Sequence, residues 1–201
     1  MLFKIPKLRL PRSKWNSLKT LSKNEDGVAA IEFALIAPIM ALLYFGSIEL
    51  SLLMEADRRV TTVTATIGDL TSREVVVRND DVNDIFEAAS LLLSPLDPDI
   101  AELRITSLIA DSNGVVTVDW SDGLRTTPRQ PGSQIDDLPN GIVPAGGSII
   151  LAEVAYDYDS PINYLGDPDT NGKRSLTDKR IEDSFYLRPR RTNIIQRDTS
   201  G

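Results

Sequence analysis

A long run of apolar residues is the first pattern in the chain. It extends from Val28 to Leu53 and follows a basic N-terminal stretch. The positions in it that are not apolar are Glu32, Pro38, Gly46, Ser47, Glu49 and Ser51. About 20 mainly apolar residues, at a rise of about 1.5 Å each, cover the hydrocarbon core of a bilayer. The pattern predicts a transmembrane helix over residues 28–53.

The apolar pattern then narrows to a stripe, which predicts that the helix extends over residues 54–72. The stripe has spacings of three and four residues and consists of Leu53, Ala56, Val60, Val63, Ile67 and Leu70. Such a stripe is suited to packing on one partner, while the opposite face stays in water. Gly68 is a point where this helix is expected to be weak.

A second helix is predicted over residues 79–94, with Asp80 or Asp81 as its cap and Ser94-Pro95 as its end. Its apolar face comprises Val82, Ile85, Phe86, Ala89, Leu92 and Leu93. The acidic group Asp80, Asp81 and Asp84 is expected in a first turn because of the helix dipole, and it need not bind a metal.

Strand patterns dominate the rest of the chain. Leu103, Ile105 and Ile109 share one face of a first strand, and Val116, Val118 and Trp120 share one face of a second. Asn113-Gly114 between them predicts a hairpin with a type I′ turn. Residues 128–147 are rich in Pro and Gly and predict a long surface loop, either a binding element or merely mobile.

Two further strands are predicted, over residues 148–158 and 181–187. In the third strand, one face carries Ile150, Ala152, Val154, Tyr156 and Tyr158. The expected fold is α+β: a long N-terminal transmembrane helix that extends into a small head, residues 73–201, with a second helix and an antiparallel sheet of about four strands. Trp120 and the tyrosines are expected mostly in the core, with an assembly surface as the alternative.

The charge distribution predicts the orientation in the membrane. The basic residues before Gly27 are Lys4, Lys7, Arg9, Arg12, Lys14, Lys19 and Lys23, and no acidic residue occurs in the first 24. This asymmetry places the N-terminus in the cytoplasm and the C-terminal domain in the periplasm or outside the cell. Residues 1–27 are therefore either a leader that is removed or a cytoplasmic tail that orients the anchor.

Composition narrows the function. The formal net charge is −7, and removal of residues 1–27 would take away seven basic and two acidic residues and leave −12. So acidic a surface argues against nucleic acid as a partner. The chain has no Cys and no His, and it lacks a phosphate-binding glycine loop and a nucleophile elbow. We therefore expect neither an enzyme nor a small-molecule substrate.

Glu32 is the most unusual residue in the apolar run. A carboxylate there costs some kilocalories per mole on insertion scales and usually marks a paired or functional position. Cleavage after Gly27 would create a positive α-amino group at Val28, which Glu32 could neutralise on its own subunit or on a neighbour.

The segment resembles the TadE-like pilus assembly proteins of Tad (Flp-type) systems. The resemblance rests on the string from Gly27 to Pro38, Gly-Val-Ala-Ala-Ile-Glu-Phe-Ala-Leu-Ile-Ala-Pro, and it is specific over about residues 23–55. In this family a basic leader ends in Gly and the fifth mature residue is Glu followed by an aromatic residue. Here these positions are Gly27, Glu32 and Phe33. The run Phe185 to Arg190 also resembles a terminal motif of some members.

The resemblance implies a minor pilin or pseudopilin in the inner membrane. A prepilin peptidase would cut between Gly27 and Val28, and Glu32 and Pro38 would serve in assembly. The expected partners are the peptidase, other pilin and pilus-assembly membrane proteins and the lipid bilayer. The alternative is an uncleaved, single-pass anchored periplasmic scaffold or binding protein that keeps its leader.

A calcium site is the only cofactor for which the chain offers a pattern. Oxygen donors with the spacing of a calcium loop occur at Asp167, Asp169, Asn171, Ser175 and Asp178, with the carbonyl of Lys173. Asp178 replaces the usual Glu, and no clear helix precedes Asp167. An ordinary solvated turn is the alternative, and no other cofactor is expected.

Overall fold

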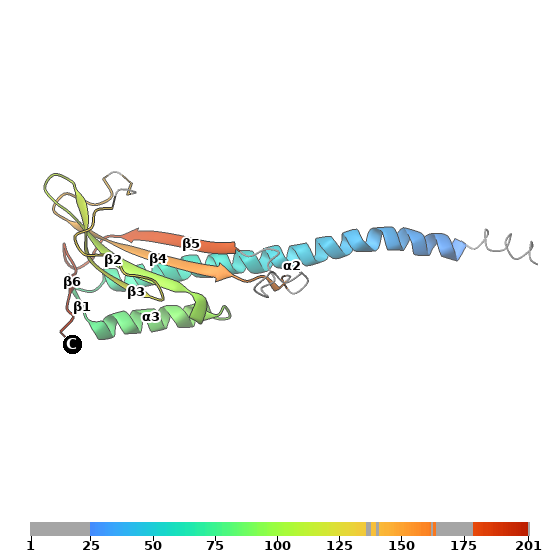
Figure 1. Ribbon diagram of the computed structural model, residues 1–201, viewed down its shortest axis with the longest axis horizontal. Helices are drawn as coiled ribbons and strands as arrows, with labels where there is room; N and C mark the ends of the chain where they lie inside the picture. The colour runs from blue at the N-terminus through green and yellow to red at the C-terminus, as the bar shows by residue number, and fades with distance from the viewer. Residues whose placement is uncertain (1–24, 136–137, 140, 162, 164–178, 201) are drawn as a thin grey trace, which may run out of the picture. The chain divides into compact units, whose positions relative to one another are not determined.

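The computed structural model describes residues 25–135, 138–139, 141–161, 163 and 179–200 (Figure 1). Two compact units are present, Met1–Ile48 and Glu49–Gly201. The predicted α+β class is confirmed, since the chain has a long N-terminal apolar helix, a second helix and a four-stranded antiparallel sheet. All but the last three residues of the predicted leader lie outside the described residues.

The first helix, α2 (Glu25–Ser72), has 48 residues and includes the predicted transmembrane segment and its extension. The predicted stripe is confirmed. Ala56, Val60, Val63 and Ile67 have no exposed surface, and Leu53 and Leu70 pack against the same core. Full burial of a Val or Ile side chain stabilises a fold by about 1.5–3 kcal/mol. This half of α2 therefore contributes one wall of the core.

Gly68 has a packing role that the sequence did not suggest. A Cβ atom at this position would lie 2.4 Å from Cδ1 of Leu187 and 3.2 Å from Cβ of Ala152. Glycine lets α2 approach the sheet closely here, and the helix continues past it to Ser72. The threonines of this half also fit the helix, because Thr64 and Thr71 each donate a hydrogen bond to the carbonyl four residues before, at 2.8 and 2.7 Å.

The second helix, α3 (Asn79–Leu93), matches the prediction closely, with two differences. Asp81 is not the cap but lies in the first turn, where its carboxylate accepts a 2.8 Å hydrogen bond from the N–H of Arg78, the capping residue. Leu92 is 42% exposed and does not belong to the apolar face. The other predicted members, Val82, Ile85, Phe86, Ala89 and Leu93, are buried against α2 and the sheet.

The four-stranded sheet has the order β3-β2-β4-β5, and all neighbours are antiparallel. The strands are β2 (Glu102–Ala110), β3 (Val116–Leu124), β4 (Ser148–Tyr158) and β5 (Lys179–Leu187). One face packs on α2 and α3 (Figure 1), and the predicted inner row of β4, from Ile150 to Tyr158, is buried in that core. Trp120 is buried there too.

The β2–β3 hairpin is confirmed, but its type I′ turn is wrong. That turn needs a positive φ at both central residues. Gly114 has a φ of 82°, whereas Asn113 does not adopt a positive φ. The N–H of Gly114 instead donates to the carbonyl of Asp111 at 3.1 Å, and the N–H of Val115 donates to the Asp111 carboxylate at 2.8 Å. Side-chain capping by Asp111 selects a type I turn followed by a left-handed glycine.

A β-bulge changes which residues of the hairpin face the helices. Ser107 pairs with Trp120 but Leu108 pairs with Val118, so Asp119 is the extra residue. Ile109 is half-buried and is not part of the core that contains Leu103 and Ile105. The bulge exchanges the two faces of β3, so Val116, Val118 and Trp120 do not share one face as predicted: Trp120 lies in the core with α2 and α3, whereas Val118 is buried on the opposite face of the sheet. A second apolar cluster forms there from Leu108, Ala110, Val118, Val143, Ile149 and Leu151.

The described part of the predicted loop, residues 128–147, covers this second cluster. Val143 is buried in it, and Ile135, Leu138 and Ile142 pack against it. Gln134 forms an isolated bridge with Thr117 beside β3. This part of the loop is therefore a packed cover of the sheet.

A small parallel sheet was not expected. It joins β1 (Val76–Val77) to β6 (Gln196–Arg197), and a 3-10 turn, η1 (Pro98–Ile100), precedes β2. The C-terminal segment is held to the core because Nε1 of Trp120 donates a 2.8 Å hydrogen bond to the carbonyl of Ile195. Arg197 also forms an ion pair with Asp122 at 2.7 Å.

Candidate membrane and assembly segment

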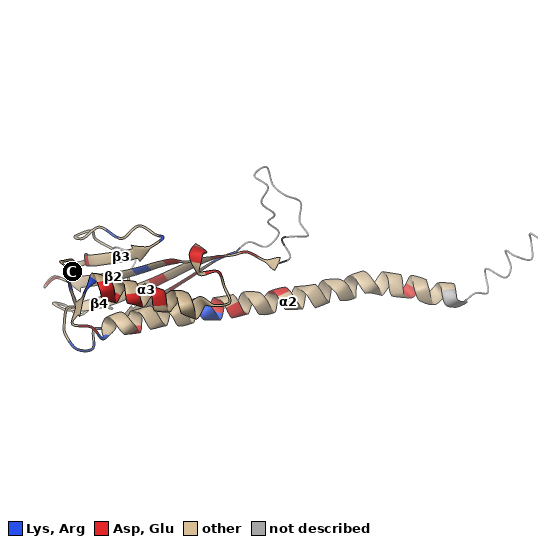
Figure 2. Ribbon diagram, turned by 90° about the horizontal axis from the view of Figure 1, so that it is seen from below, with Lys and Arg blue, Asp and Glu red and all other residues tan. Residues whose placement is uncertain are grey.

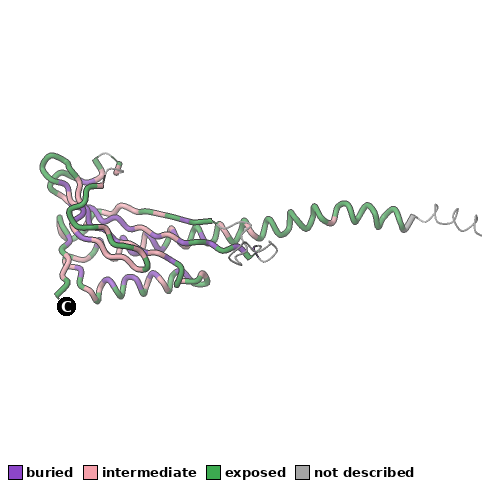
Figure 3. Tube along the Cα trace, viewed as in Figure 1, coloured by how far each residue is buried: buried purple, intermediate pink, exposed green. Residues whose placement is uncertain are grey.

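The N-terminal part of α2 exposes its apolar side chains on all faces (Figure 3). They are Val28, Ile31, Phe33, Leu35, Ile36, Ile39, Met40, Leu42, Leu43, Tyr44, Phe45, Ile48, Leu50, Leu52 and Met54. Figure 2 shows that few charges interrupt this part of the helix. Among the described residues, Gly27–Ser72 is the one helix long and apolar enough to cross a membrane. So large an apolar surface needs lipid or partner helices to cover it.

The predicted processing residues lie in the first turns of this helix. Val28, Glu32 and Phe33 are exposed, at 56% and 72% for the two apolar residues. Val28 and Glu32 are four residues apart, so they lie on one face of the helix, one turn from each other. An α-amino group on Val28 would therefore lie within reach of the Glu32 carboxylate.

Gly27 has no packing reason to be glycine. A Cβ atom at this position would have no other atom within 4 Å among the described residues, and its φ is not positive. Gly46, in the same exposed part of α2, is equally open. The contrast with Gly68 shows that the structure explains one helical glycine by packing and leaves Gly27 without such a reason.

Pro38 lies inside α2, and the helix continues on both sides of it. Proline removes one intrahelical hydrogen bond donor. The carbonyl that would have accepted this bond has to be satisfied locally or by a neighbouring helix, as in membrane bundles.

The predicted calcium ligands, from Asp167 to Asp178, lie outside the described residues. Within the part of the chain that the structure describes, no group of three or more acidic residues is placed to hold a metal ion.

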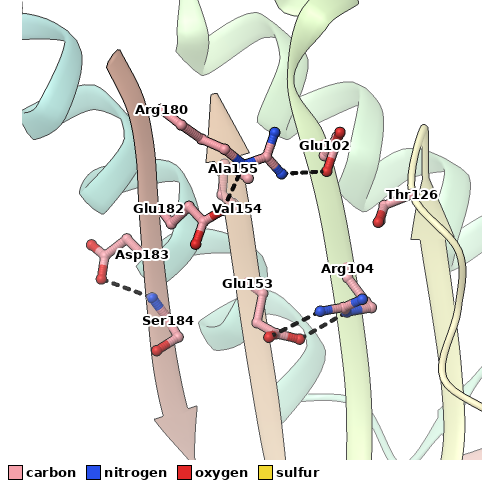
Figure 4. Close-up of a pocket in the computed structure, with 10 residues that line it drawn as sticks. All are labelled: Glu102, Arg104, Thr126, Glu153, Val154, Ala155, Arg180, Glu182, Asp183 and Ser184. Carbon is pink, nitrogen blue, oxygen red and sulfur yellow. Dashed lines mark hydrogen bonds and ion pairs between the residues drawn. The ribbon is translucent and has the colours of Figure 1, made fainter. Parts of the chain in front are cut away.

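A charged groove on the sheet was missed in the sequence. It has a volume of about 520 Å³ and lies between β2, β4 and β5. Figure 4 shows its lining: Glu102, Arg104, Thr126, Glu153, Val154, Ala155, Arg180, Glu182, Asp183 and Ser184. Of its charged side chains, all but Asp183 belong to two separate ion-pair clusters.

The first cluster has two guanidinium groups on one carboxylate. Arg104 donates to both oxygens of Glu153 at 2.9 and 3.1 Å, and Nη2 of Arg129 donates to it at 2.9 Å. Burial raises the pKa of Glu153, but the hydrogen bonds from Arg129 and Arg104 outweigh it and hold the pKa below its ordinary value. This cluster ties the loop that carries Arg129 to the sheet.

The second cluster has the reverse arrangement, with one guanidinium among three carboxylates. Arg180 donates to Glu102 at 2.7 Å, to Asp157 at 3.2 Å and to Glu182 at 2.5 Å. Hydrogen bonds to Glu102 and Glu182 raise the pKa of Arg180 above its ordinary value. The cluster carries two net negative charges.

The sequence contained part of the signal for this groove. Arg104 alternates with inward-facing apolar residues on β2, and Glu153 does so on β4. Their pairing depends on the register that places Arg104 opposite Glu153, two residues 49 positions apart in the chain. That register is not visible in a single sequence.

These features define a class: an α+β protein with one N-terminal helix that could span a membrane and a separately packed C-terminal unit. Residues 27–68 match the family model of the TadE-like proteins, which confirms the resemblance seen in the sequence over this segment. The match begins at Gly27 and includes Glu32, Phe33 and Pro38. The similarity to TadE-like proteins therefore covers residues 27–68 of the 201-residue chain.

No curated protein and no solved structure matches the chain. The C-terminal unit beyond residue 68 is therefore described by its own structure alone.

Proposed function

We propose that the protein is a minor pilin-like subunit that takes part in the assembly of a Tad (Flp-type) pilus. The observation that carries the proposal is the TadE-like match, which begins at Gly27 and lies on a helix whose N-terminal half exposes apolar side chains on every face. Its role is structural: the N-terminal helix packs with lipid and with other pilin helices, and the C-terminal unit faces the periplasm or the cell exterior.

In this proposal a prepilin peptidase removes residues 1–27. Gly27 is open on all sides, as a residue must be that enters the active site of another protein. The cut leaves a positive amine on Val28, and Glu32 lies one turn further along the same face. In the apolar interior of a membrane this amine and carboxylate stabilise each other far more than they would in water. Pairing them within or between subunits sets the axial position of each helix.

The first experiment tests processing. Full-length protein is produced in its native host, recovered from membranes, and analysed by N-terminal sequencing and intact mass. We expect a chain that begins at Val28. Gly27→Ala should prevent the cut, while Gly46→Ala, a matched change at an equally open helical glycine, should leave it intact.

A native chain that begins at Met1 would contradict the proposal. That result would favour an anchored periplasmic scaffold or binding protein that keeps its leader.

The second experiment tests assembly after the cut. Glu32→Gln keeps the size of the side chain and removes its charge, so we expect normal processing with a loss of pili on the cell surface. Glu55→Gln is the control, because Glu55 is on the same helix but forms its ion pair with Arg59 at 2.7 Å in the C-terminal unit. Full piliation with Glu32→Gln would refute the assigned role of this carboxylate.

A further inference from the structure

The open face of β5 carries opposite charges at its two ends. β5 is an edge strand of the sheet. Because side chains alternate along a strand, Arg180, Glu182, Ser184 and Tyr186 share the face away from the helices. Arg188 follows directly after the strand, next in this alternation. The surroundings of Arg180 and of Arg188 differ in net charge.

The beginning of β5 is acidic. The three carboxylates around Arg180 leave two net negative charges, and they remain accessible, since the side chains of Asp157 and Glu182 are 62% and 64% exposed. The groove shown in Figure 4 opens at this place, with Glu102 and Glu182 on its walls. Glu102 and Glu182 each bind Arg180 through one oxygen and have a second oxygen for another donor.

The segment after β5 is basic and held in place. Arg188 and Arg191 are exposed and make no hydrogen bond or ion pair with any described residue. Arg190 between them is fixed to α2, because its side chain forms an ion pair with Asp69 and its N–H donates to the carbonyl of Ser72 at 2.9 Å. Two unpaired guanidinium groups are therefore presented from a fixed backbone.

The two ends cannot neutralise each other within one molecule. Arg180 and Arg188 are eight residues apart, or roughly 26 Å at the rise of a β-strand. Backbone pairing of β5 with another strand is also disfavoured. The N–H of Ser184 is occupied by the Asp183 carboxylate at 2.8 Å, and charged side chains on an edge strand oppose strand addition. A contact at this edge has to use side chains.

We propose that Arg188 and Arg191 of one copy bind the acidic cluster of Glu102, Asp157 and Glu182 around Arg180 in the next copy. The two patches differ, so the contact is heterologous and propagates along a row of subunits. It rests on the proposed function, because assembly through the anchor helices brings many copies side by side. In a chain with a net charge of −7, this local attraction also offsets the general repulsion between copies.

Cross-linking in native membranes tests the contact, since the chain has no cysteine of its own. Ser184→Cys in the groove and Asn193→Cys, at an exposed site next to the basic segment, are combined in one chain, which keeps Arg188, Arg191 and all three carboxylates. A short bismaleimide should give a ladder of dimers, trimers and larger products. Glu87→Cys, at an exposed site on α3, combined with Asn193→Cys is the matched control and should give no ladder.

Charge reversal sharpens the test. Arg188→Glu in the cysteine pair background should lower the cross-linked yield about fivefold, the effect of one exposed ion pair of about 1 kcal/mol. Adding Glu182→Arg should restore it, which also shows that the single variant was folded. A cross-linked yield no higher than that of the α3 control would overturn the inference. Cross-linking that gives only dimers would overturn it as well.

The N-terminus of the same material separates this inference from the proposed function. Chains that begin at Val28 but form no ladder would refute the contact and leave the pilin-like role standing. Chains that begin at Met1 would refute the pilin-like role, whatever the ladder shows.

Discussion

The two halves of α2 differ in apolar content and have opposite environments. Between Val28 and Leu52 the large apolar side chains are exposed on every face, whereas Ala56, Val60, Val63 and Ile67 have no exposed surface at all. The first half needs an external apolar phase, and the second half finds its apolar phase in α3 and the sheet. The width of the apolar surface therefore distinguishes the two halves. A helix that is apolar on every face needs lipid or partner helices, whereas a helix with one apolar stripe packs on a protein core.

This difference implies that the halves contribute unequally to folding. Side chains of the second half lose stabilising contacts when they are shortened, because the core around them is closely packed. The exposed apolar side chains of the first half belong to no packed core within the described chain. Their substitution should instead affect membrane retention or assembly.

The largest expected effect comes from one substitution made in both halves. Ile67→Ala should lower the free energy of unfolding of the C-terminal unit by about 3 kcal/mol, because it leaves a cavity at a fully buried site. Ile39→Ala, at a residue that is 61% exposed, should change it by less than about 0.5 kcal/mol. Denaturant unfolding of the detergent-solubilised chain, followed by Trp120 fluorescence in a Trp15→Phe background, measures both.

Equal losses of unfolding free energy in Ile67→Ala and Ile39→Ala would contradict this difference between the two halves of α2. They would mean that the first half of α2 is also packed against protein in the folded chain, contrary to its exposure.

The second-largest expected effect concerns a buried hydrogen bond of the C-terminal unit, between Trp120 and Ile195. Trp120→Phe removes the donor to the carbonyl of Ile195, a residue with no exposed surface. An unpaired buried carbonyl costs about 2 kcal/mol, so the melting temperature in calorimetry should fall. Hydrogen exchange should show faster opening of the β1–β6 pair. Trp15→Phe, the same change in the predicted leader, should alter neither, and an unchanged β6 exchange rate in Trp120→Phe would refute the fastening role of this bond.

The elements of the fold could be predicted from the sequence because each has one buried face. The spacing of Val60, Val63 and Ile67 gave the inner face of α2, and the alternation of Ile150, Ala152 and Val154 gave that of β4. These patterns are local, and burial selects them directly. Sequence reasoning failed wherever a contact joins distant parts of the chain.

The bulge at Asp119 is the clearest example. It places Val118 and Trp120 on opposite faces of the sheet, but it is determined by the pairing of two strands and not by either strand alone. The turn at Asn113 was misjudged because the Asp111 side chain, which captures the N–H of Val115, was left out of the prediction. The β1–β6 pair has two residues in each strand, too few to leave a pattern.

The candidate site residues also fall into two groups, those marked by a local pattern and those brought together from distant parts of the chain. Gly27, Glu32 and Phe33 were found because their spacing along one helix is itself the signal. The charged groove was missed because Glu102 and Arg180 come together only through the sheet, although they are 78 residues apart in the chain.

The smallest expected effect is a dependence of thermal stability on pH. It arises in the C-terminal unit and not in the exposed half of α2. Arg104 and Arg129 lower the pKa of Glu153 in the folded protein, against an ordinary value of 4.5. A carboxyl group with a lowered pKa contributes stability that is complete above its unfolded pKa and is lost as pH falls through the folded value. The melting temperature should therefore decline below about pH 4.5, and Glu153→Gln should remove part of this decline.

Glu153→Gln should also lower stability at pH 7 by about 1 kcal/mol, because two guanidinium groups then face each other without a carboxylate between them. Glu87→Gln makes the same chemical change at an exposed site on α3, and it should keep both the stability at pH 7 and the acid decline. If Glu153→Gln and Glu87→Gln gave the same pH profile, the Arg104–Glu153–Arg129 cluster would not hold the loop against the sheet. The attachment of that loop would then rest on the second apolar cluster alone, which Val143→Ala would reveal by a larger loss.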